Sequence, residues 1–521
     1  MAAALGAFLL LRLTAWPPHE DEALALFVGQ GSLSDVLETV LGERGGAPLH
    51  FLLAWLVSEA GGGLEALRLL SAFFALLSLP LIAALAARLA DRAVALVATL
   101  IAAAGWVLLF HGIYARMYSL FLFTSLLSYL ALLAAIERGG SRRWLLWIAA
   151  ALLTVAAHPY GALVLASQAL YVALIRERLR AALAAFAAVA VLGTPFWLAD
   201  LVLADRFEVG VGPGGEKLGG PVAVLQYLGE VAGDFSVGWT LALPLVLALA
   251  GVGLRSLART NRRSALLVLA VVAVPTATFL FARLGRSTSP ETRHLIFALP
   301  FFVTLLAAGL VSVARLRKRW GPPLAAAAAV ALVAGEVAWA WNKTPALFTG
   351  EPEARIEARR AAAAWLAATG DPSDVLLGYE PVYLGAWERS ERFSRLVLPR
   401  ADAGLAAERL RQAPAPLGRG LWVLDAADTN NPVQRLRIPL RLPRPAGAFE
   451  ARTFGPYLVV RSRRPARTAA AYLEQAAAVT VLGKTLEIGD ADVNFLTVSR
   501  AAALLDYAPS EASPGRSAGS R

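Results

Sequence analysis

The sequence predicts a polytopic α-helical membrane protein, with about eleven transmembrane helices and a C-terminal α/β domain outside the membrane. Of the 521 residues, 57% are apolar and only 17% are charged. Long apolar segments recur from the N-terminus to about residue 341 and then stop. The loops between these segments alternate between basic and acidic composition. Together these observations favour a chain whose first two thirds fold in lipid rather than in water.

The apolar segments are apolar on all sides, whereas helices of soluble proteins alternate apolar and polar faces. No small-residue cleavage site precedes the acidic run at residue 20, so the first segment is interpreted as a retained helix. Its sixteen residues give only about 24 Å, so we expect either a start codon upstream of Met1 or a helix that is thin at its inner end. The expected helices cover about 1–16, 68–88, 92–110, 118–136, 144–157, 160–175, 181–198, 239–257, 264–283, 294–314 and 323–341.

Loop charge predicts the orientation of the chain. One set of alternate loops carries sixteen basic residues against three acids, Asp91, Glu137 and Glu177, and the other set is mainly acidic. The positive-inside rule places the basic set in the cytoplasm, with the N-terminus cytoplasmic and residues after about 342 outside. Abundant Ala and Arg with little Lys indicate a GC-rich bacterial genome, so we expect a multi-pass protein of the bacterial plasma membrane, surrounded by membrane lipids. The basic residues are Arg88, Arg92, Arg138, Arg142, Arg143, Arg176, Arg178, Arg180, Arg255, Arg259, Arg262, Arg263, Arg315, Arg317, Lys318 and Arg319.

Composition also excludes two classes of function. The net charge of +11 is accounted for by the cytoplasmic loops, so no nucleic-acid partner is expected. The chain has no cysteine, which excludes a disulfide framework and a thiolate metal site.

The predicted domains are a transmembrane module over 1–341, an extracytoplasmic α/β domain over 342–508 and a disordered tail over 509–521. The transmembrane module has two long outer loops, 17–68 and 199–238, and the second is glycine-rich, as expected of a mobile lid. Because channels and many transporters keep their loops short, long outer loops favour a reaction at the outer face. In the C-terminal part we expect helices over 353–368 and 401–411 and strands near 374–378, 396–398, 421–424 and 457–460.

An acidic run, His19-Glu20-Asp21-Glu22, directly follows the first apolar segment. Carboxylates at a membrane surface can be a solvated flank. Repulsion among three adjacent carboxylates also raises the pKa of at least one of them, which prepares a general base.

Sequence motifs in the same order link the chain to a known family. Asp21-Glu22-Ala23, followed by the stretch Ala47–Leu53 (APLHFLL), resembles the first outer loop of the bacterial family 39 glycosyltransferases. That group includes aminoarabinose transferases of lipid A, protein mannosyltransferases and rhizobial lipopolysaccharide glycosyltransferases. Further similar stretches are Arg68–Ala72 (RLLSA), Tyr114–Ser119 (YARMYS), Glu291–Pro300 (ETRHLIFALP) and Asp371–Pro381 (DPSDVLLGYEP).

This resemblance implies the GT-C fold and a function. Family members take a sugar from a polyprenyl-phosphate donor and pass it to an extracytoplasmic glycan, lipid or protein, and their first-loop Asp, here Asp21, is the catalytic base. Glu22 would orient Asp21 or bind a metal. The lipid phosphate leaving group needs cations, and Arg116 and Arg293 lie at predicted outer helix starts, where an anion can be bound. For either arginine, a headgroup-level anchor is the alternative.

One departure from the family pattern concerns a metal. Relatives usually have a second acid in the second outer loop, but Tyr114 holds that position here and residues 117–119 offer no carboxylate. The cofactor is therefore unknown and a divalent metal is doubtful, although Glu22 with His50 or His111 could still supply ligands.

All five histidines are predicted at or near the outer face, where they are either ligands of sugar and phosphate or interfacial residues. We count His50, His111, His158 and His294 as candidate substrate-binding residues, together with Tyr114, Tyr160 and Lys217 of the glycine-rich loop. Trp16, Trp106 and Trp239 are expected to form the interfacial aromatic belt.

The sequence thus predicts an inverting membrane glycosyltransferase. The alternatives are a transporter or flippase for lipid-linked glycans, and a catalytically inactive GT-C scaffold that binds lipid-linked sugar. A transporter would carry charges in the middle of its helices. Glu336 is the notable such residue. The missing second acid keeps the scaffold reading open.

Overall fold

The computed structural model describes residues 1–206, 220–281, 291–316, 319–398, 409–410, 412–413, 417–425 and 449–465. The chain forms two compact units. Of the described residues, those in 1–16, 28–205 and 220–349 form the bundle unit, and those from 350 onwards form the C-terminal unit together with 17–27. Lys217, the glycine-rich stretch around it, most of the expected helix 401–411 and the tail 509–521 lie outside the described residues.

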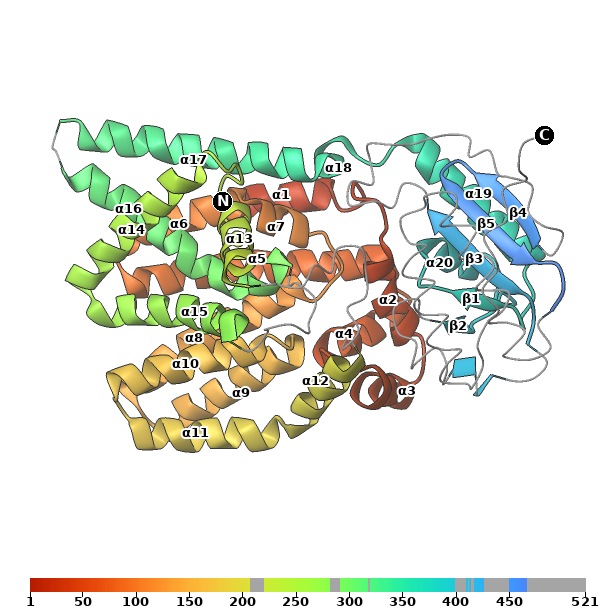
Figure 1. The fold of residues 1–521 in the computed structure, drawn as a ribbon, viewed down its shortest axis with the longest axis horizontal. Helices are drawn as coiled ribbons and strands as arrows, with labels where there is room; N and C mark the ends of the chain where they lie inside the picture. Colours follow the sequence, from red (N-terminus) through yellow and green to blue (C-terminus); the bar gives the residue numbers. More distant parts are fainter. Residues whose placement is uncertain are drawn as a thin grey trace, which may run out of the picture. The chain divides into compact units, whose positions relative to one another are not determined.

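Every apolar segment predicted from the sequence is helical (Figure 1). The bundle helices are α1 (Ala2–Leu11), α3 (Leu33–Glu38), η1 (Thr39–Arg44), α4 (Pro48–Glu59), α5 (Leu64–Leu89), α6 (Arg92–Ala104), α7 (Trp106–His111), α8 (Tyr118–Arg138), α9 (Ser141–Ala157), α10 (Gly161–Ile175), α11 (Leu179–Leu192), α12 (Thr194–Arg206), α13 (Pro221–Asp234), α14 (Leu243–Thr260), α15 (Arg262–Phe281), η2 (Thr292–Ala298), α16 (Leu299–Leu316), α17 (Gly321–Lys343) and α18 (Pro345–Thr349). Helix α2 (Glu20–Gly29) begins in the C-terminal unit and ends in the bundle.

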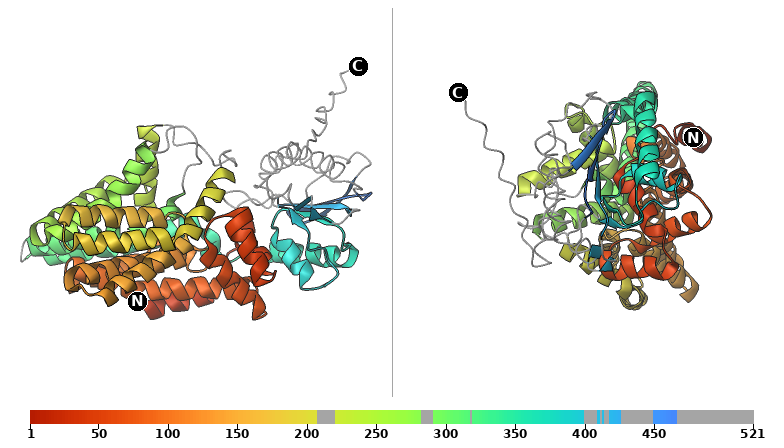
Figure 2. Two further views of the ribbon diagram at one scale, coloured as in Figure 1. Left: turned by 90° about the horizontal axis from the view of Figure 1, so that it is seen from below. Right: turned by 90° about the vertical axis from the view of Figure 1, so that its right-hand side faces the viewer.

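Six of the described helices are long and apolar enough to cross a membrane, or seven if the bent pair of α11 and α12 is one span. The long helices run side by side in Figure 1 and in the left view of Figure 2. Two predicted helices are interrupted. The expected helix 92–110 breaks at Gly105 between α6 and α7, and the expected helix 181–198 bends by 58° between α11 and α12.

Three ion pairs join loops at the end of the bundle where α5, α8 and α16 end. The sequence placed only three acids among the sixteen basic residues of these loops, and each acid pairs with an arginine from elsewhere in the chain. The pairs are Arg88–Glu137 (2.6 Å), Arg315–Asp91 (3.0 Å) and Arg263–Glu177. Because these side chains are largely exposed, each pair contributes little to stability, and it fixes which loops meet.

The C-terminal unit contains a five-stranded sheet in the order β2-β1-β3-β5-β4. Strands β1 (Val375–Leu377), β2 (Val397–Leu398) and β3 (Gly420–Asp425) are parallel, and β4 (Phe449–Phe454) and β5 (Tyr457–Ser462) complete the sheet as an antiparallel hairpin. Helices α19 (Glu353–Thr369) and α20 (Pro381–Trp387) pack with the sheet around a core that includes Leu366, Tyr383 and Leu421. The predicted strands are confirmed. Strand β4 (FEARTF) was not predicted, because Glu450 and Arg452 interrupt the apolar run that marks the other strands.

A buried ion network holds α19 to the sheet. The Arg355 guanidinium on α19 donates to both carboxylate oxygens of Asp425 at the end of β3, at 3.1 and 2.5 Å. It also lies 3.0 Å from Glu351, which pairs with Arg359. Since the chain has no cysteine, packing and this network stabilise the unit without a disulfide.

Helices α14 and α16 approach closely because each places a glycine at their crossing. A Cβ atom on Gly253 would lie 2.0 Å from the Leu305 carbonyl oxygen, and one on Gly309 would lie 2.3 Å from the Leu249 carbonyl oxygen. Small residues at such positions let membrane helices pack backbone against backbone.

This crossing generates a stability prediction. We expect Gly253→Ala to lower the free energy of unfolding by about 1–3 kcal/mol, because the added methyl group forces the helices apart. Gly251→Ala is the matched control, because a Cβ there meets nothing within 4 Å. Thermal unfolding in detergent should show a lower midpoint for Gly253→Ala alone, and equal midpoints for the two variants would contradict the role of the crossing.

Candidate functional site

Eight of the nine predicted substrate-binding residues gather at one end of the bundle, with one further residue, Tyr118. They come from α4, the end of α7 and the loop after it, the start of α8, the end of α9, and η2. We call this group the His-Arg cluster: His50, His111, Tyr114, Arg116, Tyr118, His158, Tyr160, Arg293 and His294. Lys217, the ninth predicted residue, lies outside the described part of the chain.

Tyr118 lies in the middle of the cluster and is 2% exposed. Its ring centroid is 5.0 Å from that of His111, 5.8 Å from that of His158 and 6.0 Å from that of His294. The Arg293 guanidinium carbon lies 5.2 Å from the same centroid, a cation–π geometry. Tyr118 belongs to the YARMYS stretch, but it was not among the residues predicted for the site.

Rings from two further elements extend this arrangement. The His294 ring centroid lies 5.2 Å from that of Tyr160 and 5.6 Å from that of His158. Tyr114 stacks on Phe110 at 5.0 Å between centroids. The rings of the cluster other than that of His50 therefore form one connected set, with the Arg293 guanidinium beside Tyr118.

Backbone contacts fix the tautomers of two histidines. His158 Nδ1 accepts a hydrogen bond from the Tyr160 backbone N–H at 3.0 Å, and His294 Nδ1 accepts one from the Glu291 backbone N–H at 3.0 Å. A backbone N–H can only donate, so Nδ1 carries the lone pair and the proton of the neutral ring lies on Nε2. Both rings therefore offer an N–H donor and no second acceptor.

The histidines contribute no charge. Burial, and then the nearby positive charge of Arg116, lowers the pKa of His50 to about 3, and burial with both Arg116 and Arg293 lowers the pKa of His158 to about 3. His50 also forms a hydrogen bond with the backbone of Ala115, next to Arg116. At neutral pH the positive charge of the cluster thus resides on its two arginines, and both act on the buried His158 ring.

A buried carboxylate, that of Asp234, lies next to the cluster and contacts η2, one of the elements that carry it. Asp234, 3% exposed at the end of α13, accepts hydrogen bonds from Thr292 Oγ1 at 2.5 Å and from Trp339 Nε1 at 3.1 Å, and it pairs with Lys343. Thr292 directly precedes Arg293 in η2, and Trp339 and Lys343 lie on α17. Asp234 therefore ties α13, η2 and α17 together beside one of the two arginines.

Contacts around this carboxylate correct one prediction. Trp106 is 5% exposed, so it does not belong to an interfacial belt. Instead the Lys343 ammonium lies 3.9 Å from the centre of its ring, while Trp239 is 45% exposed. Two further contacts are made by Glu291, which precedes η2: the Tyr227 hydroxyl donates to its carbonyl at 3.1 Å, and Arg293 donates to its carboxylate at 2.6 Å.

The acidic run lies in the C-terminal unit, where it forms the start of α2. His19 Nδ1 accepts from the Asp21 backbone N–H at 3.1 Å, and the Glu22 carboxylate accepts from the His19 backbone N–H at 3.2 Å. This is a capping box in which an imidazole takes the place of the usual hydroxyl. Glu22 is fully buried and serves this cap, whereas Asp21 is half-buried.

No group of three or more His, Asp or Glu side chains in the described residues is arranged to hold a metal ion. The carboxylate that was the best candidate ligand, that of Glu22, already accepts the His19 backbone N–H.

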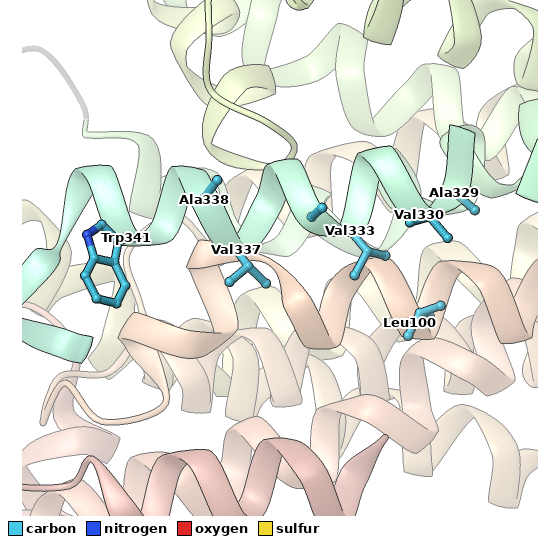
Figure 3. Close-up of a pocket in the computed structure, with 8 residues that line it drawn as sticks. Leu100, Ala329, Val330, Val333, Val337, Ala338 and Trp341 are labelled. Carbon is cyan, nitrogen blue, oxygen red and sulfur yellow. The ribbon is translucent and has the colours of Figure 1, made fainter. Parts of the chain in front are cut away.

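An apolar groove runs along α17 in the bundle unit and has a volume of about 640 Å³. Figure 3 shows residues from Ala329 to Trp341 along α17, with Leu100 of α6 facing them. Lys343, which pairs with Asp234, follows two residues after Trp341 on the same helix. The helix that lines the groove thus also carries a support of the His-Arg cluster.

The buried imidazoles predict a pH dependence of stability. His158 is neutral in the folded state above about pH 3 and becomes protonated in the unfolded state below about pH 6.5. The free energy of unfolding therefore decreases by up to about 1.4 kcal/mol per pH unit as the pH falls through this window. His158→Asn keeps an acceptor for the Tyr160 N–H but cannot titrate, so its unfolding midpoint should fall less than that of the wild type between pH 7 and pH 5. Parallel curves would contradict a depressed pKa.

No protein-family model and no curated protein sequence matches the chain. Solved structures do. ArnT from Cupriavidus metallidurans in the apo state is 14% identical over 88% of this chain and 96% of its own, with a TM-score of 0.51. The same protein bound to undecaprenyl phosphate gives 13% identity, the same coverages and 0.49. The archaeal oligosaccharyltransferase AglB from Archaeoglobus fulgidus, in complex with an inhibitory peptide and a dolichol-phosphate, gives 12% identity over 81% of this chain and 69% of its own, with 0.45. The likeness to apo ArnT shows the fold, so the chain is a membrane protein with the GT-C fold.

Proposed function

We propose that the protein is an inverting membrane glycosyltransferase that moves one sugar from a polyprenyl-phosphate carrier to a hydroxyl group of an extracytoplasmic glycan, lipid or protein. The observation that carries this proposal is the gathering of cations with buried rings: the Arg293 guanidinium carbon lies 5.2 Å from the centre of the Tyr118 ring, and the charges of Arg116 and Arg293 both act to lower the pKa of the buried His158. Two guanidinium groups with no ionised imidazole between them form a site for a small anion with fixed charge.

The charge of this site suits the leaving group better than the donor. A polyprenyl-phosphate sugar is a phosphodiester with one negative charge, and the released polyprenyl phosphate carries nearly two near neutral pH. The second charge develops as the bond between the anomeric carbon and the phosphate oxygen breaks. Cations beside the phosphate therefore stabilise the transition state more than the bound donor, which is what accelerates a reaction.

In the proposed step the acceptor oxygen attacks the anomeric carbon from the face opposite the phosphate. Asp21 takes the proton of the attacking hydroxyl, and the electron pair of the breaking bond goes to the phosphate. One bond forms, one breaks and the configuration at the carbon inverts. Glu22 accepts a hydrogen bond in the helix cap. Its role is therefore to position Asp21, and it does not transfer a proton itself.

The neutral rings have a different role from the arginines. His158 and His294 offer Nε2–H groups, and Tyr118 and Tyr160 offer phenol hydroxyls. Such groups orient sugar hydroxyls and phosphate oxygens without adding charge. We assign the prenyl chain to the groove along α17, because the groove is apolar. The same helix carries Lys343, which pairs with Asp234 next to the His-Arg cluster.

The transporter alternative has one specific observation in its favour. Glu336, in the middle of the span α17, is 1% exposed, and neither of its carboxylate oxygens has a hydrogen-bond partner in the described residues. A single acid does not line a path, and the charged groups otherwise gather at the helix ends. Consumption of a radiolabelled donor separates the readings, since a transporter or an inactive scaffold binds the donor without cleaving it.

The first test replaces the proposed base. Asp21→Asn should lower sugar transfer by roughly 10²–10⁴-fold, the range expected for loss of a general base, with unchanged thermal unfolding. Asp35→Asn is the matched control, since Asp35 is an exposed acid in the same predicted loop. The assay uses purified protein and a panel of radiolabelled polyprenyl-phosphate sugars, with and without chelator. Near-normal transfer by Asp21→Asn would remove the proposed mechanism.

The second test concerns the charge of the anion site. Arg293→Gln and Arg116→Gln should each weaken inhibition by polyprenyl phosphate about 10–100-fold, and should weaken binding of the singly charged donor less. The value of kcat should therefore fall more than KM for the donor rises. Arg319→Gln is the control, since Arg319 lies beside Trp320 at the other end of α16. Equal losses of donor and product affinity would show that the arginines bind both states uniformly.

A further inference from the structure

The segment that carries Asp21 belongs to the C-terminal unit, although more than three hundred residues of sequence separate them. Residues 17–27 cluster with the part of the chain after Gly350, and the rest of the predicted first outer loop clusters with the bundle. The proposed base is therefore held by the C-terminal domain.

Two contacts hold this segment. The Tyr379 backbone N–H donates a hydrogen bond to Glu20 Oε1 at 3.1 Å. The Phe27 ring lies 5.5 Å from the ring of Tyr379 and 4.5 Å from that of Trp387, between centroids, and packs against the core of the domain. The contacts flank Asp21 at both ends of its helical segment, one polar at the first turn and one aromatic two turns later.

The polar contact lies just beyond the carboxyl end of β1. Tyr379 follows β1 and Gly378, whose φ of +83° turns the chain sharply away from the strand. Strand β1 is the middle of the three parallel strands, with β2 on one side and β3 on the other. In α/β domains, ligands bind at the carboxyl ends of parallel strands. Here the first turn of α2 occupies that position.

Within that turn, every acid has a separate task. Glu22 closes the cap on His19, and Glu20 accepts the Tyr379 N–H. Asp21 lies between these two anchored residues, and its own backbone N–H is bound to His19. The position of Asp21 is therefore set from both sides.

We propose that Glu20 is a positioning residue for Asp21, and that the C-terminal domain is a working part of the transferase because it holds the base through this tether. This inference rests on the proposed function, since Asp21 must be the base for its position to matter. A shift of about 1 Å in a reacting group costs on the order of 10²-fold in rate. The tether thus governs the chemical step, and donor binding depends on the His-Arg cluster of the bundle unit.

The experiment compares Glu20→Ala with Glu20→Gln. The amide oxygen of Gln can still accept the Tyr379 N–H, but Gln has no charge. We expect Glu20→Ala to lower kcat by about 10–100-fold with KM for the donor unchanged, and Glu20→Gln to keep most of the wild-type rate. Glu59→Ala is the control, an exposed acid of the same predicted loop. Equal loss in the Ala and Gln variants would overturn the tether, because it would show that the charge of Glu20, rather than its hydrogen bond, is needed.

Hydrogen exchange provides a readout that does not depend on activity. The Tyr379 amide should exchange at least 10-fold faster in Glu20→Ala than in the wild type or Glu20→Gln, together with the amides of the first turn of α2. Unchanged exchange would overturn the tether. Faster exchange with an unchanged kcat would overturn the positioning role. If the wild type consumes no donor, the proposed function fails, whereas the exchange data still decide whether the C-terminal domain holds the segment.

Phe27→Ala is a second variant that removes the other contact. It should lower kcat in the same way as Glu20→Ala, and the double variant should lose less than the product of the two single losses, because both act by releasing the same segment. Losses that multiply would indicate that the two residues act independently and would contradict a shared tether.

Discussion

Asp234 brings three separate segments together beside the His-Arg cluster. A carboxylate that is 3% exposed would be strongly unfavourable without partners, and this one has a hydroxyl, an indole N–H and an ammonium around it. These partners come from η2 and α17, whereas the acid comes from α13. Because the energetic cost of leaving any of them unpaired is high, the three segments are fixed relative to one another. Arg293 and His294 directly follow Thr292, one of these partners, in the sequence.

The arginines and the histidines of the cluster have different electrostatic roles. Burial keeps His50 and His158 neutral, so the arginines supply the charge and the rings supply direction. A mixed cluster of ionised and neutral imidazoles would change its charge with pH and would bind phosphate groups of different charge indiscriminately. Fixed charge with neutral donors is the better arrangement for the proposed reaction, in which the site must prefer the leaving group over the donor. The proposed base, Asp21, belongs to the other compact unit.

Much of this could be predicted from the sequence, for physical reasons. Helices in lipid must be long and apolar, so their segments stand out, and their alternating direction indicated that residues after α7, after α9 and before α16 share one end of the bundle. The breaks at Gly105 and Gly193 were missed because a glycine in an apolar run can equally lie within a helix. Asp234 and Tyr118 were missed because their importance comes from partners distant in sequence. The same is true of Glu20, whose partner is a backbone N–H and carries no signal of its own.

The use of imidazoles to start helices has a consequence for how related sequences should differ. His19, His158 and His294 each accept a backbone N–H through Nδ1, a task that a short amide, carboxylate or hydroxyl side chain also performs. Evolution can therefore exchange these histidines for Asn, Asp, Ser or Thr without disturbing the backbone. These residues cannot replace the N–H donor at Nε2 of each ring. A histidine that is exchanged for them among relatives therefore serves only to cap the backbone. A histidine that is kept in all relatives is required for the group that its Nε2 binds.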